Sequence, residues 1–184
     1  MKKLIFVCLL SLSCLAVQAR RTSPGQFFVD AYGTYSMTSF GGGVTFGGYT
    51  RLGYWYGGGT FANNTCMLSV GTEMDFPHLF ADGGYMFRIV STRSHSFNIY
   101  GGAGGFLGAE LVDPQGKIAP SGKISPSGKV YGTSFLYGFY PQLTAEVFPF
   151  ESVAFFVDAR MPVNFVSIGG HIFFHLSVGV RINL

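Results

Sequence analysis

The chain has 184 residues, which suits a single domain. Only 11% of the residues are charged, 17% are aromatic and 27 are glycine, whereas about a quarter of the residues of a soluble globular protein are charged. This composition argues against an ordinary solvated surface and fits a protein whose outside contacts lipid, although an aggregation-prone all-β protein shares it. The formal net charge of +3 is too small to indicate nucleic-acid binding.

Residues 1–19 are predicted to be a cleaved export signal. A basic start is followed by the largely apolar stretch Leu4–Val17, and small residues precede the expected cleavage after position 19. The alternatives are a membrane anchor, for which the stretch is short, and a lipoprotein signal at Cys14. Cleavage leaves residues 20–184 as one domain with a net charge of +1 and Cys66 as its one cysteine, so that no internal disulfide can form.

After the signal, apolar and polar residues alternate over several stretches, which predicts β-strands because successive strand side chains point to opposite faces. In the last stretch every second residue from position 174 to position 184 is apolar. In chain order the predicted strands are Phe27–Tyr35, Val44–Tyr54, Leu68–Phe76, Leu79–Ile89, Phe97–Leu107, Phe139–Val147, Val153–Met161 and Phe174–Leu184.

These strands predict an all-β protein, a transmembrane antiparallel up-and-down β-barrel of about eight strands. No apolar run after residue 19 is long enough for a helical span. A closed barrel is then the fold that pairs every backbone group within lipid. A soluble, secreted β-sandwich is the alternative, and it would have to bury the same apolar rows against a second sheet.

The connections predict how the barrel is oriented. Ser91–Ser96 and Pro149–Ser152 are short and are expected to be periplasmic turns, whereas Asp113–Lys129 is long and is expected to be extracellular. This scheme requires the glycine- and asparagine-rich stretch Tyr56–Thr65 to be a further periplasmic turn.

The long connection contains a repeat of Gly, Lys, Pro and Ser, which predicts an exposed extended loop at about residues 113–129. Lys117, Lys123 and Lys129 are the candidates to contact a partner or anionic lipopolysaccharide. The alternative is that these lysines only keep the loop solvated.

The polar phase of the strands predicts a lumen that is filled rather than open. Phe80, Phe106, Tyr140, Phe148 and Phe156 fall on the inward phase and would help to close a channel. The inward charges form a predicted lumen charge network in which pairing offsets the cost of burial. Its members are Asp30, Arg51, Glu73, Asp82, Arg88, Glu146, Asp158, Arg160 and Arg181.

The sequence contains little that indicates catalysis. The one cysteine left after cleavage and the scattered histidines make no metal site. No cofactor motif is complete either, so we expect no metal, no cofactor and no enzymatic activity. The one exception is His175 and Ser177, which share a strand face as a base and a nucleophile would. This His-x-Ser spacing resembles that of lipid A deacylases, so a lipid-modifying barrel enzyme is an alternative.

Several stretches between about residues 80 and 184 resemble the TraO family of conjugal transfer proteins, which Bacteroides-type conjugative transposons encode. The stretches are Gly83–Arg88, Ser91–Ser94, Asn98–Gly104, Gly108–Glu110, Thr144–Val147 and Gly179–Asn183. The resemblance implies an outer-membrane component of a DNA-transfer apparatus and brings no catalytic residues.

The sequence therefore predicts a non-enzymatic barrel of the bacterial outer membrane. Its expected partners are outer-membrane lipid, lipopolysaccharide and other proteins of the conjugation apparatus, without direct contact to nucleic acid. A general outer-membrane barrel that serves in adhesion or envelope defence, like OmpX or OmpW, is the alternative.

Overall fold

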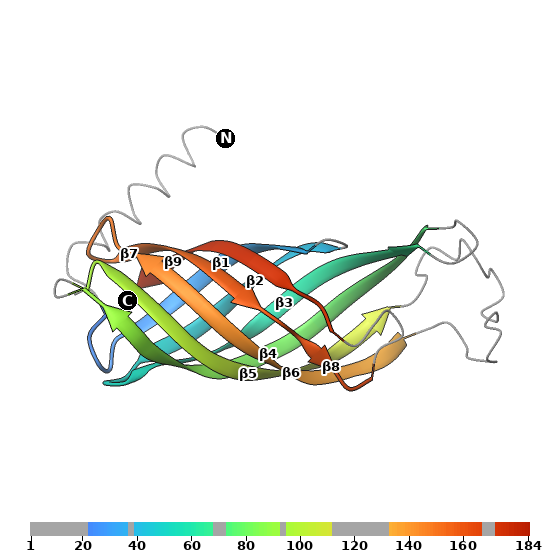
Figure 1. The fold of residues 1–184 in the computed structure, drawn as a ribbon, viewed down its shortest axis with the longest axis horizontal. Helices are drawn as coiled ribbons and strands as arrows, with labels where there is room; N and C mark the ends of the chain where they lie inside the picture. Colours follow the sequence, from blue (N-terminus) through green and yellow to red (C-terminus); the bar gives the residue numbers. More distant parts are fainter. Residues whose placement is uncertain (1–21, 37–38, 68–72, 93–94, 112–132, 167–171) are drawn as a thin grey trace.

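A computed structural model describes residues 22–36, 39–67, 73–92, 95–111, 133–166 and 172–184. These residues form a single antiparallel sheet that curves into an elongated barrel (Figure 1). The strands are β1 (Phe27–Ser36), β2 (Ser39–Tyr49), β3 (Gly53–Met67), β4 (Glu73–Ser91), β5 (Phe97–Leu111), β6 (Thr133–Val147), β7 (Val153–Arg160), β8 (Val163–Asn164) and β9 (His175–Asn183).

The sheet closes on itself. The strand order is β5-β4-β3-β2-β1-β9-β7-β6-β8, and β5 also pairs with β6. The two-residue β8 continues the position of β7 beside β6, with Val163 opposite Phe139. Pro162 separates β7 from β8 because proline has no N–H to donate to a ladder. The predicted fold, an antiparallel barrel of eight strands, is confirmed, with one strand broken at a proline.

The predicted bounds of two strands are wrong. Val44–Tyr54 is not one strand, because β2 ends at Tyr49 and the chain turns before β3 begins. Tyr56–Thr65, which was expected to be a turn, lies wholly within β3. The described part of Leu68–Phe76, residues 73–76, is not a separate strand, since it belongs to β4, which continues to position 91, and residues 68–72 lie outside the described residues. The consecutive glycines 57–59 carry no side chain, so the sequence shows no alternation where the ladder in fact continues.

The two faces of the barrel differ as the alternation predicts. On β9, Leu176 and Val178 face outward, whereas His175, Ser177 and Arg181 are buried inside. The same inside-polar pattern holds around the barrel, so that most buried side chains in the described ranges are polar, charged or tyrosine. The outer surface is apolar and the interior is polar, the reverse of a soluble β-protein.

Aromatic rings gather on the outer face at both ends of the barrel. Phe27, Phe46 and Trp55 form one cluster, with ring centroids 5.5–6.3 Å apart. At the opposite end, Tyr137 packs against Phe135 at 5.7 Å and Phe165 at 5.6 Å. Barrels that span membranes carry such rings at both edges of their apolar band.

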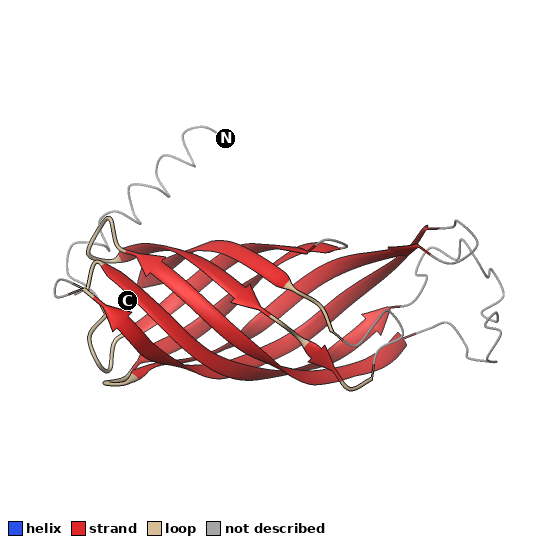
Figure 2. Cartoon of the chain, viewed as in Figure 1, coloured by secondary structure: helices blue, strands red, loops and turns tan. Residues whose placement is uncertain are grey.

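One end of the barrel, called the turn end below, holds three connections between strands and the C-terminus (Figure 2). The turn Thr50–Leu52 lies here, as do Thr92, His95 and Ser96 between β4 and β5 and the connection at 148–152. The predicted turn Pro149–Ser152 is therefore a connection between strands. In the predicted turn Ser91–Ser96, Ser91 is the last residue of β4, and residues 93–94 lie outside the described residues. The predicted signal and the Asp113–Lys129 loop lie outside the described residues.

In the described part of the chain, no helix has the length and apolar character needed to cross a membrane.

Candidate functional site

The interior of the barrel holds two buried arginines, each surrounded by carboxylates and tyrosines. Arg181 projects from β9 and Arg160 from β7, and both are less than one-tenth exposed. Tyr54, Tyr56, Tyr100 and other large side chains from the neighbouring strands fill the space around them. Two charged clusters therefore take the place that an apolar core has in a soluble domain.

Arg181 binds two carboxylates from opposite sides. Its Nε and Nη2 donate to the two oxygens of Asp30 at 2.8 Å each, and its Nη1 donates to Glu146 Oε2 at 2.9 Å. The guanidinium lies 3.9 Å from the centre of the Phe28 ring and 4.4 Å from that of Tyr54. This bidentate pairing stacked on aromatic faces uses the planar geometry of arginine, which a lysine does not have.

The second oxygen of Glu146 is also fully used. Its Oε1 accepts hydrogen bonds from Asn98 Nδ2 at 2.9 Å and from the Tyr100 hydroxyl at 2.8 Å. Thr45 donates in the same way to Asp30, at 3.2 Å. The side chains therefore come from strands around much of the barrel, and they hold those strands in one register.

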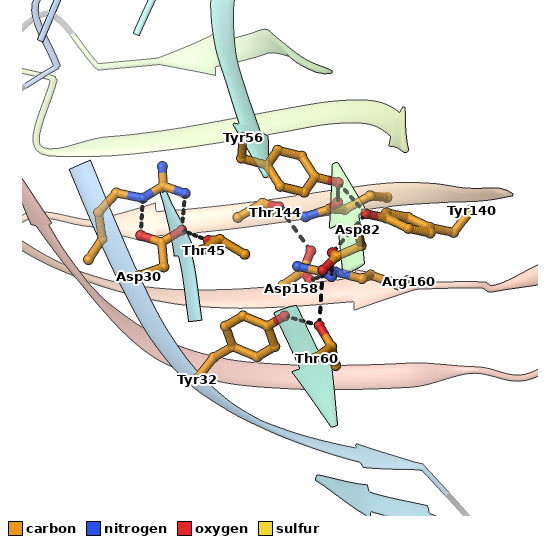
Figure 3. Close-up of polar contacts among 12 residues, drawn as sticks. Asp30, Tyr32, Thr45, Tyr56, Thr60, Asp82, Tyr140, Thr144, Asp158 and Arg160 are labelled. Atoms are coloured by element: carbon orange, nitrogen blue, oxygen red, sulfur yellow. Dashed lines mark hydrogen bonds and ion pairs between the residues drawn. The ribbon is translucent and has the colours of Figure 1, made fainter. Parts of the chain in front are cut away.

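Arg160 forms the second cluster, shown in Figure 3. Its Nη1 donates to Asp82 Oδ2 at 2.9 Å and its Nε to Asp158 Oδ2 at 2.5 Å. Tyr140 and Thr60 donate to the same Asp82 carboxylate at 3.0 and 3.1 Å. Hydroxyl groups thus occupy the acceptor positions of the carboxylates that arginine leaves open.

A contact between a histidine and a carboxylate lies farther from the turn end. His78 Nε2 and Glu110 Oε1 are 3.0 Å apart across the β4–β5 ladder, and both side chains are buried. A cavity of about 20 Å³ in this part of the lumen is lined by His78, Arg160, His175 and mostly apolar groups. That volume accommodates about one water molecule.

The structure brings together six of the nine residues of the predicted lumen charge network. They are Asp30, Asp82, Glu146, Asp158, Arg160 and Arg181, in the contacts given above. Arg88 also faces inward from β4 but has no carboxylate partner: its Nε and Nη2 are buried without a hydrogen bond. Glu73 begins β4, and its side chain lies outside the described part of the chain.

Arg51 was placed wrongly, because it lies in the exposed turn between β2 and β3 rather than in the lumen. The prediction extends the inward-facing phase of β2 across the β2–β3 turn, because the residues of this turn do not indicate a turn in the sequence. At this turn the phase changes, so that Tyr54 points inward and Trp55 outward.

Glu110 and its partner His78 are buried in the lumen but were not among the predicted lumen residues. Glu110 continues the inward phase of Asn98, Tyr100 and Phe106, but the predicted strand stopped at Leu107. Extending the alternation by three residues beyond Leu107 identifies it. The three candidate lysines at positions 117, 123 and 129 lie outside the described residues.

The geometry gives no support to the His175–Ser177 enzyme hypothesis. Both side chains are buried in the lumen, away from the lipid-facing surface where a lipid substrate would lie. His175 Nε2 has no hydrogen-bond partner, so it does not contact the Ser177 hydroxyl. The adjoining cavity is far too small for an acyl chain. Within the described ranges, no group of three or more His, Cys, Asp or Glu side chains is placed to hold a metal ion.

Comparison with solved structures defines the class of this fold as the small outer-membrane β-barrel. The chain is similar to a major outer membrane protein of Thermus thermophilus, with a TM-score of 0.59, 12% identity, and coverage of 88% of this chain and 100% of that one. It is also similar to Neisserial surface protein A, with a TM-score of 0.55, 15% identity, and coverage of 86% and 95%. At these identities the likeness shows the fold alone.

The sequence itself identifies the family. Residues 25–184 match the family described as conjugative transposon protein TraO, and the chain belongs to that family. The match extends well beyond the stretches between residues 80 and 184 that first suggested it. No curated protein matches the sequence.

Proposed function

We propose that this protein is a non-enzymatic barrel of the bacterial outer membrane that serves as an envelope component of a conjugative DNA-transfer apparatus. Membership of the TraO family carries the proposal. The barrel fold supports it, because a barrel with an apolar outside and a polar inside is suited to a lipid bilayer.

The outer surface supports a location in the membrane. Leu79, Leu107, Val178 and many other large apolar side chains are exposed on it, whereas soluble proteins rarely expose extended apolar patches. The two aromatic clusters described above lie at the two ends of this surface. By this proposal the turn end faces the periplasm, since outer-membrane barrels have short periplasmic turns and longer extracellular loops.

The filled lumen supports a structural role over a pore. Arg160, Arg181 and their carboxylates are held by several short hydrogen bonds each, and these contacts would have to break to open a path. We therefore infer that the protein acts through its outer surface and its loops, by binding lipid and other proteins of the apparatus.

Location and closure are tested by cell fractionation and by gel electrophoresis of boiled and unboiled samples. We expect the protein in the outer-membrane fraction, with faster migration of the unboiled form. The single tryptophan, Trp55, lies on the outer face, so brominated lipids should quench its fluorescence. A soluble protein with no gel shift and no quenching would contradict the membrane proposal.

The role in transfer is tested by an in-frame deletion of the gene in the donor strain, with the intact gene supplied in trans as the control. We expect mating frequency to fall strongly, complementation to restore it, and excision of the element to continue. Unchanged mating frequency in the deletion strain would remove the proposed role. Altered adhesion or envelope sensitivity in that case would favour a general outer-membrane barrel instead.

A further inference from the structure

Arg88 differs from the other two inward-facing arginines that the structure describes. Arg160 and Arg181 each bind two carboxylates, whereas the Nε and Nη2 atoms of Arg88 are buried and have no hydrogen-bond partner. Burying a charged donor without an acceptor is unfavourable, so the position calls for an acceptor that the described residues do not supply.

The backbone holds Arg88 in this position. Its amide donates to Leu52 O at 2.7 Å, and its Cα lies opposite that of Tyr100 on β5. A β-bulge follows at once, because the register shifts between Arg88 and Val90. Ile89 and Val90 are both exposed as a result. Bulges re-aim side chains and are common beside functional sites.

No carboxylate of the described lumen is left to serve Arg88. The guanidinium lies 5.9 Å from the centre of the Tyr100 ring, and the hydroxyl of that ring occupies Glu146. Glu146 also accepts from Asn98 and Arg181. Glu146, the carboxylate that Tyr100 connects to Arg88, therefore already accepts hydrogen bonds from three side chains.

Other unpartnered polar atoms lie at the same end of the barrel. Asn183, two residues beyond Arg181 at the end of β9, has neither its Nδ2 nor its Oδ1 hydrogen-bonded, although the side chain is buried. Thr22, just before β1, is also buried with an unpartnered hydroxyl. The turn end of the lumen therefore holds unpartnered polar groups on β9 and just before β1 as well as on β4.

We propose that the turn end of the lumen is a binding site for a carboxylate-bearing ligand, with the Arg88 guanidinium as its anchor. The planar fork of arginine matches a carboxylate, and Arg181 binds Asp30 in this way through its Nε and Nη2, the same two atoms that are unpartnered in Arg88. On the orientation proposed above, the ligand comes from the periplasm. The binding itself does not depend on a role in conjugation, so it can fail while the proposed function stands.

The test uses the purified barrel, refolded in detergent, with acetate as the probe. The fraction that remains folded after heating is read from the gel shift, in sodium acetate and in sodium chloride of equal ionic strength and pH. Acetate at ten times its dissociation constant should lower the apparent unfolding constant about elevenfold. Chloride serves as the control for screening.

Arg88→Gln should remove the increase in the folded fraction that acetate gives over chloride. Arg88→Lys, which keeps the charge but not the planar fork, should retain only part of this increase. Arg51→Gln is the matched control, since Arg51 is an exposed arginine at the same end of the barrel. It should behave like the wild type. If Arg88→Gln does not refold, saturation-transfer NMR to the acetate methyl compares wild type, Arg88→Lys and Arg51→Gln.

Two results would overturn the proposal. In the first, the wild type gains nothing from acetate over chloride, and Arg88 is then only a counter-charge to the Glu146 cluster. In the second, Arg88→Gln or Arg88→Lys keeps the full acetate-specific signal, and the carboxylate binds elsewhere.

Discussion

Replacing Arg181 with methionine should destabilise the barrel more than other single substitutions in the lumen. Methionine keeps much of the side-chain length but removes three N–H donors from two carboxylates. Asp30 and Glu146 would remain buried without a counter-ion, although Thr45, Asn98 and Tyr100 still donate to them. Removing one partner of a buried ion pair costs about 3–5 kcal/mol. The unfolding equilibrium should shift by roughly 10²- to 10⁴-fold, since about 1.4 kcal/mol corresponds to a factor of ten.

The measurement is urea unfolding in lipid vesicles, followed by the fluorescence of Trp55. Arg51→Gln is again the control, and its free energy of unfolding should stay within about 0.5 kcal/mol of the wild type because the side chain is exposed. The triple variant Asp30→Asn, Glu146→Gln, Arg181→Met removes all three charges together. It should be more stable than Arg181→Met alone, because an unpaired buried charge is more costly than a neutral group.

The reasoning would be refuted if Arg181→Met unfolded within about 1 kcal/mol of the wild type. It would also be refuted if the triple variant were no more stable than the single one. Either outcome would mean that the buried carboxylates need no arginine, and that packing and lipid alone hold the register of the strands.

Three further predictions use the same barrel. Gly104→Ala should lower the free energy of unfolding by about 1–3 kcal/mol in the same urea assay, because the added Cβ would lie 2.6 Å from the Tyr140 ring. Gly59→Ala is the control: its Cβ would have no atom within 4 Å, so the variant should be neutral or stabilised by up to about 1 kcal/mol. Val178→Arg, on the outer face of β9, should cost about 2–4 kcal/mol in vesicles if this face contacts the bilayer midplane, and an unchanged unfolding midpoint would contradict that contact. Ser177→Ala should leave the lipid A mass spectrum of the cells unchanged; a lipid A species lost in the variant would restore the enzyme hypothesis.

Local alternation was enough to predict which face of most strands is apolar. The last strand shows this best, since Leu176, Val178 and Ile182 share one face by strand geometry alone. The same reasoning assigned Asp30, Asp82, Asp158 and the two paired arginines to the interior before any partner was known. Closure follows from the same pattern, because a lipid-facing sheet cannot leave an edge unpaired.

Alternation did not locate the turn between β2 and β3. The stretch Gly57–Gly59 has no side chains to alternate, so its strand was read as a turn. The real turn, Thr50–Leu52, was predicted to be part of a strand, and Arg51 was therefore assigned to the inner face although it is exposed. Here pairing with β2 and β4 decides the structure, and pairing is a property of neighbouring strands rather than of the segment itself.

Apart from the β2–β3 turn and the last residues of β5, the sequence by itself determined which residues face inward and which face outward, since this depends only on the two-residue period of a strand. Which inward residues meet was decided by the tertiary structure. Arg181 binds Asp30, which is 151 positions away in the chain, because closure and register place β9 beside β1. The same register leaves Arg88 without a carboxylate, although its sequence context resembles that of the paired arginines. An ion pair forms only when its two charged groups lie close together, and in a barrel the distances between side chains on different strands are set only once the sheet has closed.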